Sequence, residues 1–212
     1  MKIFVTDFDG TMTQCDFYRI VQARLVPPGT HDYWEDYRAG RLTHFEALQA
    51  IFRHIRGSED ELLAAAYEME LDPRAGKAIV RLREAGWEVR VASAGCLWYI
   101  DRLLVEQDIR VTVYANPGTY DPQQGLLMTP PVDSPYFSPQ TGIDKLAIVR
   151  AALDATPEVA FAGDGPPDLE PVLLVPPRRR FARGYLAEAL QARGESYRSY
   201  GCWSDIAEML VK

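Results

Sequence analysis

The chain has 212 residues and a net charge of −7, and this length fits one or two domains with a sizeable apolar core. No global positive field would draw in nucleic acid or an anionic membrane, so we expect neither as a partner. The three cysteines are isolated, which argues for a reducing compartment and against a zinc site or a disulfide framework. Because we find no signal peptide and no apolar run of membrane-spanning length, we predict a cytoplasmic protein.

The first predicted element is a buried strand over residues 1–6, which ends at two closely spaced carboxylates, Asp7 and Asp9. Because one residue separates them, both leave the strand on nearly the same side. Burying such a pair is unfavourable unless a cation lies between them, and Mg²⁺ is a hard cation that takes oxygen ligands. Gly10 and Thr11 then permit a tight turn and offer an N–H and a hydroxyl to an anion. The pattern indicates metal-assisted phosphoryl transfer.

The segment from about residue 16 to residue 70 has a helical pattern. Two of its helix starts, at Thr43 with Glu46 and at Ser58 with Glu61, have the spacing of a capping box. All three histidines of the chain lie in this segment without metal-ligand spacing, so we expect them on the surface or on helix faces. The predicted helices span residues 16–25, 32–39, 43–56 and 58–69.

Strand and helix alternation resumes after this segment. Asp72 as N-cap and Pro73 at the first helical position are predicted to open a helix. The strand predicted next, over residues 87–92, ends at Ser93-Ala94-Gly95, where a hydroxyl and small-residue amides can bind phosphate oxygens. Farther along the chain, residues 120–125 have the composition of a hairpin turn.

The remaining polar positions come from a helix start and from a third strand end. Lys145 begins a helix-like run to Leu153, where its ammonium can act as a point charge on phosphate and on a nucleophile. A strand over residues 159–162 leads into Gly-Asp-Gly-Pro-Pro-Asp, which places Asp164 and Asp168 at its terminus. Four groups of polar residues thus follow strands or open a helix in a consistent order.

These elements predict an α/β fold, a doubly wound parallel sheet with its site at the carboxyl ends of the strands. The helical segment falls directly above that site as an inserted cap, which would exclude water until substrate is bound. We therefore divide the chain into a catalytic core domain, residues 1–14 and 72–212, and a helical cap domain, residues 15–71.

The ordered set Asp-x-Asp-Gly-Thr, Ser, Lys and Gly-Asp-x-x-x-Asp resembles the haloacid dehalogenase superfamily of phosphatases over nearly the whole chain. The resemblance implies a Rossmann-like core in which Asp7 is the nucleophile that becomes an aspartyl-phosphate. It implies that Asp9 is first the general acid for the leaving alkoxide and then the base that activates water. Mg²⁺ would be held by the carboxylates of Asp7 and Asp164 and by the carbonyl of Asp9. Asp168 would lie behind these ligands or bind the ion through water.

The same resemblance assigns the phosphate-binding groups. The hydroxyl of Ser93 and the amides of Ala94 and Gly95 would bind the phosphoryl oxygens, together with Thr11, and Lys145 would neutralise their charge. The implied ligand is a small phosphorylated metabolite. The sequence leaves the oligomeric state open, a homodimer included.

Two branches of the superfamily resemble this chain. The helical insertion is similar to the cap of the phosphoserine phosphatase-like branch, whose acidic cap position is Asp16 here. Asp16 could hold a substrate hydroxyl or ammonium, or it could serve as a helix N-cap. The substrate-binding arginine of that branch falls at Ile51 in a count without gaps, and Arg41 or Arg53 could substitute for it.

Residues 181–186, Gly194, Tyr197 and residues 203–206 resemble the methionine-salvage phosphatases, which act on a hydroxy-keto-methylthiopentenyl phosphate. In that interpretation Tyr33, Trp34 and Tyr37 form an apolar cap wall for a thioether tail, or else they pack in the core. Phosphoserine or another phosphomonoester is the alternative substrate. A phosphotransferase using the same intermediate and a non-catalytic phosphate-ester-binding protein are the alternative functions.

Overall fold

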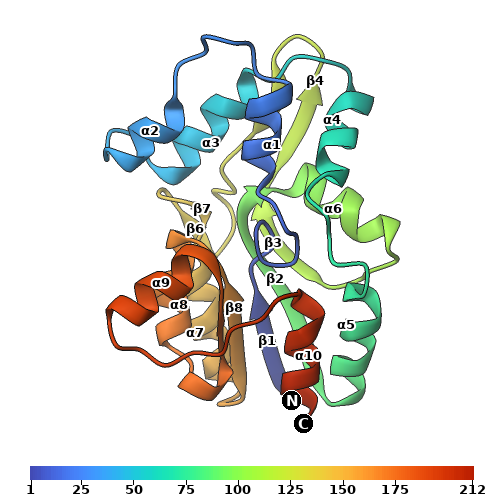
Figure 1. Cartoon of the computed structure of the whole chain (residues 1–212), viewed down its shortest axis with the longest axis vertical. Helices are drawn as coiled ribbons and strands as arrows, with labels where there is room; N and C mark the ends of the chain where they lie inside the picture. The colour runs from blue at the N-terminus through green and yellow to red at the C-terminus, as the bar shows by residue number, and fades with distance from the viewer.

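The computed structural model describes residues 1–212, and its centre is a five-stranded sheet with the strand order β3-β2-β1-β8-β9 (Figure 1). All four pairings within this sheet are parallel. The doubly wound α/β fold is therefore confirmed. The helices and strands are β1 (Lys2–Thr6), α1 (Phe17–Arg24), α2 (Tyr33–Arg38), α3 (His44–Arg53), α4 (Glu59–Tyr67), α5 (Ala75–Glu84), β2 (Trp87–Cys96), α6 (Leu97–Glu106), β3 (Thr112–Asn116), β4 (Gly118–Asp121), β5 (Gly125–Met128), β6 (Phe137–Ser138), β7 (Gly142–Ile143), α7 (Lys145–Ala155), β8 (Val159–Gly163), α8 (Leu169–Leu173), β9 (Arg180–Ala182), α9 (Gly184–Ala192) and α10 (Trp203–Val211).

The central strand β1 sets the position of the site. Its residues from Ile3 onward are fully buried, as expected for a parallel strand covered on both faces. Thr6, its last residue, is in register with Val91 of β2 and Ala162 of β8. Three neighbouring strands therefore reach the same edge of the sheet, and the loops that follow them meet there.

The two faces of the sheet carry separate apolar clusters. Phe4 points to the face covered by α5, α6 and α10, where Trp203 stacks on its ring at a centroid distance of 5.7 Å. Ile3 and Val5 point to the opposite face, which α7, α8 and α9 cover (Figure 1). The alternation of side chains along β1 thus explains why helices pack on both sides. None of these helices combines the length and the apolar composition that a membrane-spanning segment needs.

Helices α1 to α4 lie beyond the carboxyl ends of the strands, within the segment predicted as the cap (Figure 1). Both predicted capping boxes are present, at Thr43 with Glu46 and at Ser58 with Glu61. The predicted hairpin is also present as β4 and β5, and it packs against α3, where Gln49 Nε2 donates to the Met128 carbonyl at 2.9 Å. The exact division into core and cap domains stays a prediction.

Several predicted boundaries were wrong. Strand β2 continues to Cys96, so the Ser93-Ala94-Gly95 segment belongs to the strand rather than following it. Helices α3 and α4 end two or three residues earlier than predicted. Helix α5 begins at Ala75 with Arg74 at its N-cap position, so Asp72 lies two residues before the cap. The Asp72 carboxylate accepts the N–H of Arg74 at 2.8 Å within this loop and that of Ser204 at 2.7 Å. Asp72 instead ties this loop to the start of α10.

Candidate functional site

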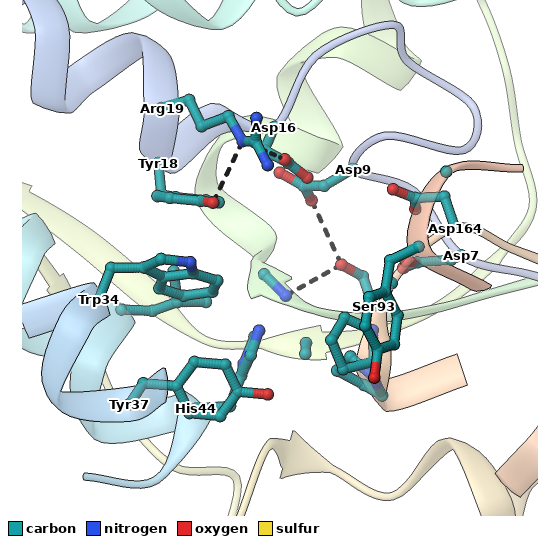
Figure 2. A pocket seen from close by; sticks show the side chains of 18 of the residues that line it. Asp7, Asp9, Asp16, Tyr18, Arg19, Trp34, Tyr37, His44, Ser93 and Asp164 are labelled. Atoms are coloured by element: carbon teal, nitrogen blue, oxygen red, sulfur yellow. Dashed lines mark hydrogen bonds and ion pairs between the residues drawn. The ribbon is translucent and has the colours of Figure 1, made fainter. Parts of the chain in front are cut away.

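A cavity of about 440 Å³ lies between the carboxyl edge of the sheet and the helices above it. Its volume is in the range of small-molecule sites. Figure 2 shows carboxylates from the sheet side facing aromatic side chains from the helices across this space. The lining residues on the sheet side are Asp7, Asp9, Ser93, Ala94, Gly95, Lys145, Asp164, Gly165, Pro166 and Pro167. Those from the helices above it are Asp16, Tyr18, Arg19, Trp34, Tyr37, Arg38, His44, Leu48 and Phe52. The remaining lining residues are Tyr99, Gly184 and Tyr185.

Asp7 is the first residue after β1, and its carboxylate is held in place on one side. Its Oδ1 accepts the N–H of Phe8 at 2.7 Å and lies 2.8 Å from Lys145 Nζ. Lys145 also contacts Asp168 Oδ1 at 2.7 Å. Burial lowers the pKa of Lys145, but the nearby Asp168 and Asp7 outweigh it and raise that pKa above its ordinary value. The ammonium therefore stays charged and neutralises part of the acidic cluster.

Three carboxylates, those of Asp7, Asp164 and Asp168, each place one oxygen within 4.8 Å of the others. Asp168 is already satisfied, because its Oδ2 accepts the N–H groups of Asp164 at 3.1 Å and Gly165 at 3.0 Å. The hydroxyl of Thr11 donates to Asp164 Oδ1 at 2.8 Å. Thr11 does not line the cavity, so its contact is with a carboxylate rather than with a bound phosphate.

The charge balance of this cluster fits a divalent cation. Burial, followed by the charge of Asp168, raises the pKa of Asp164 to about 7 and raises the pKa of Asp7 well above its usual range. One ammonium, that of Lys145, faces three carboxylates. A hard cation with oxygen ligands would remove this excess negative charge. These residues could therefore hold a metal ion.

The side chain of Asp9 is not part of the acidic cluster and lies against other partners. Its Oδ1 accepts the N–H of Phe17 at 3.1 Å, and the Tyr99 hydroxyl is 2.9 Å from both of its oxygens. Burial, followed by the charge of Asp16, raises the pKa of Asp9 to about 7. A carboxyl group with a pKa near neutrality can give and take a proton at physiological pH.

The end of β2 forms the cavity wall beside Asp9. The Oγ of Ser93 accepts the N–H of Gly95 at 3.0 Å and is 3.5 Å from Asp9 Oδ2. A Cβ on Gly95 would lie 2.0 Å from the Tyr99 hydroxyl and 2.7 Å from Asp9 Oδ2, so only glycine fits here. Ser93, Ala94 and Gly95 all line the cavity. Their binding of phosphoryl oxygens stays a prediction.

The opposite wall is aromatic. Tyr18 stacks on Trp34 at a centroid distance of 4.1 Å, and Tyr37 follows at 5.0 Å from Trp34 (Figure 2). His44 packs edge-on against both Trp34 and Tyr37 at 5.3 Å. Trp34 and Tyr37 are thus cavity-wall residues, whereas Tyr33 does not line the cavity.

His44 lies on a helix face, as expected, but that face borders the cavity. Burial lowers its pKa to about 4, so the imidazole is neutral at pH 7. Its buried Nδ1 has no hydrogen-bond partner. The histidine spacing did not indicate this position, but helical periodicity could have done so, because His44, Leu48 and Phe52 recur every four residues on the cavity side of α3.

Asp16 precedes α1 at the N-cap position, yet its carboxylate caps no N–H. It pairs instead with Arg19 at 3.0 Å, and Arg19 also donates to the Tyr18 hydroxyl at 3.1 Å. Asp16 and Arg19 both border the cavity. The N-cap interpretation of the Asp16 side chain is therefore wrong, and its place in the cavity wall is the observed one.

None of the three positions considered for a substrate-binding arginine lies in the cavity wall. Ile51 is 1% exposed within the apolar cluster and does not line the cavity, so its identity cannot report on a substrate carboxylate. Arg41 and Arg53 do not line the cavity either. The arginines that do are Arg19 and Arg38, and each already pairs with a carboxylate, Arg38 with Glu35 at 2.7 Å.

Comparison with known proteins places these residues in a family. Residues 4–170 match the haloacid dehalogenase-like hydrolases. The chain is 21% identical over 211 residues to a 2-hydroxy-3-keto-5-methylthiopentenyl-1-phosphate phosphatase of Brevibacillus brevis (strain 47 / JCM 6285 / NBRC 100599), an alignment that covers 98% of this chain and 94% of that protein.

Solved structures share the fold. A phospho-aspartyl intermediate analogue of phosphoserine phosphatase has a TM-score of 0.67 at 15% identity, covering 98% of this chain and 97% of that one. An unliganded probable phosphoserine phosphatase from Vibrio cholerae has a TM-score of 0.69 at 17% identity, covering 99% of this chain and 64% of that longer one. The resemblance drawn from the four motifs is confirmed, and the chain belongs to the haloacid dehalogenase-like hydrolase family.

Proposed function

We propose that this protein is a phosphoric monoester hydrolase that uses Mg²⁺ and forms an aspartyl-phosphate on Asp7. The observation that carries the proposal is the convergence of Asp7, Asp9 and Lys145 on one cavity beside a three-carboxylate cluster. Phosphoryl transfer needs positioning and charge compensation, and these groups supply both. A non-catalytic binding protein would have no use for a second carboxyl group poised at Asp9.

In the first step, the phosphoryl group of the substrate lies against Ser93, Ala94 and Gly95, with the Lys145 ammonium nearby. The carboxylate of Asp7 attacks phosphorus as the bond to the ester oxygen breaks. Asp9, protonated in a site where its pKa is about 7, gives its proton to that leaving oxygen. A covalent intermediate divides one difficult displacement into two easier ones.

In the second step, Asp9 accepts a proton from water as the water oxygen attacks the phosphorus of the aspartyl-phosphate. The bond from phosphorus to Asp7 breaks, and inorganic phosphate leaves. When bound by Asp7, Asp164 and the carbonyl of Asp9, Mg²⁺ would neutralise phosphoryl charge. Thr11 would orient Asp164 for that role through its 2.8 Å hydrogen bond, and Asp168 would stand behind the ligands as the partner of Lys145.

For the substrate we propose a small ester with an uncharged tail, of the kind that 2-hydroxy-3-keto-5-methylthiopentenyl-1-phosphate represents. The aromatic wall of Tyr18, Trp34 and Tyr37 offers apolar surface to a thioether. Arg19 and Arg38 are already paired with carboxylates, which leaves no free cation for a substrate carboxylate. Asp16 meets Arg19 through Oδ2 alone, so its Oδ1 remains available to a substrate hydroxyl. Phosphoserine is the second candidate, because phosphoserine phosphatases share this fold.

A screen of metabolite phosphates with Mg²⁺, scored by released phosphate, tests the activity. Asp7→Asn is the matched control, because it keeps the shape and removes the nucleophile. We expect the wild type to release phosphate and not to transfer it to added sugar alcohols. With ³²P-substrate, the wild type should carry an acid-stable label on the protein, and Asp7→Asn should carry none. Labelled sugar phosphate in place of free phosphate would favour the phosphotransferase.

The substrate class is tested with Trp34→Ala and with Tyr33→Ala as its control, since Tyr33 is a neighbour on α2 that does not line the cavity. We expect Trp34→Ala to lower kcat/KM for the thioether ester by about tenfold, equivalent to ~1.4 kcal/mol, and to change that for phosphoserine by much less. Equal losses on both esters would refute the proposed role of the aromatic wall.

A further inference from the structure

Tyr99 lies in the first turn of α6 with 1% of its surface exposed, and the two-step mechanism above assigns it no role. Its hydroxyl is 2.9 Å from both carboxylate oxygens of Asp9. The ring packs against Phe17 at a centroid distance of 4.2 Å. Because the site is buried, water cannot easily replace this hydroxyl as a partner of Asp9.

The direction of the hydrogen bond follows from its other partner. The N–H of Cys96 donates to the Tyr99 hydroxyl oxygen at 3.2 Å. The single hydroxyl proton is therefore free to point at Asp9, and Tyr99 acts as the donor. The absence of a side chain at Gly95 keeps open the space that this hydroxyl occupies, since a Cβ there would lie 2.0 Å from it.

The two oxygens of Asp9 have different surroundings. Oδ1 accepts the N–H of Phe17 at 3.1 Å in addition to the Tyr99 contact. Oδ2 has only Ser93 Oγ, at 3.5 Å, beyond the Tyr99 contact. The N–H of Phe17 at 3.1 Å holds Oδ1 as an acceptor more firmly than Ser93 Oγ at 3.5 Å holds Oδ2, so the asymmetry favours Oδ2 as the proton-carrying atom on the side of the phosphate-binding residues.

We propose that Tyr99 is a positioning residue that orients the Asp9 carboxyl group so that Oδ2 exchanges the proton in both steps. When the ester bond breaks, the proton moves from Oδ2 to the leaving oxygen; when water attacks, Oδ2 takes a proton back. Tyr99 itself gains and loses none. This inference rests on the proposed phosphatase function.

The test compares Tyr99→Phe with the wild type on two esters, p-nitrophenyl phosphate and glycerol 2-phosphate. Nitrophenolate leaves without being protonated, whereas an alkoxide needs the proton of Asp9. We expect kcat/KM for glycerol 2-phosphate to fall by about 10- to 100-fold and kcat/KM for p-nitrophenyl phosphate to fall by less than about threefold. A loss of general structural support would lower both values together.

Tyr67→Phe is the control, because it removes a tyrosine hydroxyl from an exposed position on α4. Tyr67→Phe should leave kcat/KM for both esters unchanged. Equal losses on the two esters in Tyr99→Phe, or no loss on either, would overturn the positioning role. Failure of the wild type to hydrolyse either ester, or full activity of Asp7→Asn, would instead overturn the proposed phosphatase function and with it this inference.

Discussion

Replacing Asp164 with asparagine should stabilise the metal-free protein at neutral and alkaline pH, although it removes a residue from the proposed metal site. In the folded protein, burial and the charge of Asp168 raise the pKa of Asp164 from 3.8 to about 7. An unfolded chain releases that proton near pH 4. Between these two values the folded state holds a proton that the unfolded state has lost, so the stability contributed by protonation declines as pH rises towards 7.

The magnitude follows from the width of that window. Between pH 5 and pH 8, the folded state holds a proton that the unfolded state has lost over a span of roughly two pH units. This span corresponds to about 3 kcal/mol in the free energy of unfolding. For a protein of this length that is a change of about 6–12 °C in melting temperature. Asparagine cannot ionise, and its amide oxygen can still accept the hydrogen bond from Thr11. The variant should therefore lack this decline.

The assay is thermal unfolding of wild type and Asp164→Asn in EDTA from pH 5 to pH 8, and again with Mg²⁺. Comparing the two proteins cancels titrating groups that do not interact with Asp164, such as His44, whose lowered pKa of about 4 makes stability fall as the pH drops below about 6.5. Asp154→Asn, an exposed change near the end of α7, controls for the loss of a negative charge. At a concentration 100 times its Kd, Mg²⁺ should stabilise the wild type by about 3 kcal/mol and the Asp164 variant far less. Parallel pH profiles in EDTA, or equal stabilisation by Mg²⁺, would refute the reasoning.

Three further outcomes are expected. Asp9→Asn should reduce kcat by roughly 10²–10⁴-fold but weaken Mg²⁺ binding less than Asp164→Ala does, and similar affinity losses in calorimetry would contradict the separate roles. Gly95→Ala should destabilise the protein by ~1–3 kcal/mol in denaturant titrations, because its Cβ would clash with the Tyr99 hydroxyl, and adding Tyr99→Phe should recover part of that loss. Lys145→Ala should lower stability by ~3–5 kcal/mol in EDTA, since it leaves buried carboxylates without their ammonium, and an unchanged melting temperature would rule out that ion cluster as a source of stability.

The sequence alone located the polar residues that meet below the cap. Asp7, Ser93 and Asp164 come from strands whose carboxyl ends share one edge of a parallel sheet, so a strand pattern is enough to bring them together. Helix starts were equally accessible, because the capping boxes at Thr43 and Ser58 involve residues only three positions apart. The capping boxes depend on contacts within one element. The meeting of the strand ends depends on a sheet topology for which alternating strands and helices leave few alternatives.

Tertiary structure decided which side chains of the helices meet that edge. Nothing near Tyr99 in the sequence marks its hydroxyl as a partner of Asp9, because the contact requires α6 and the loop after β1 to pack at one particular distance and rotation. Ile51 and Phe52 are neighbours, yet only Phe52 lines the cavity, since one residue turns the side chain by about 100° around the helix axis. A local pattern fixes the period of a helix, whereas its rotation about its own axis is set by the side chains it packs against, and those come from distant parts of the chain.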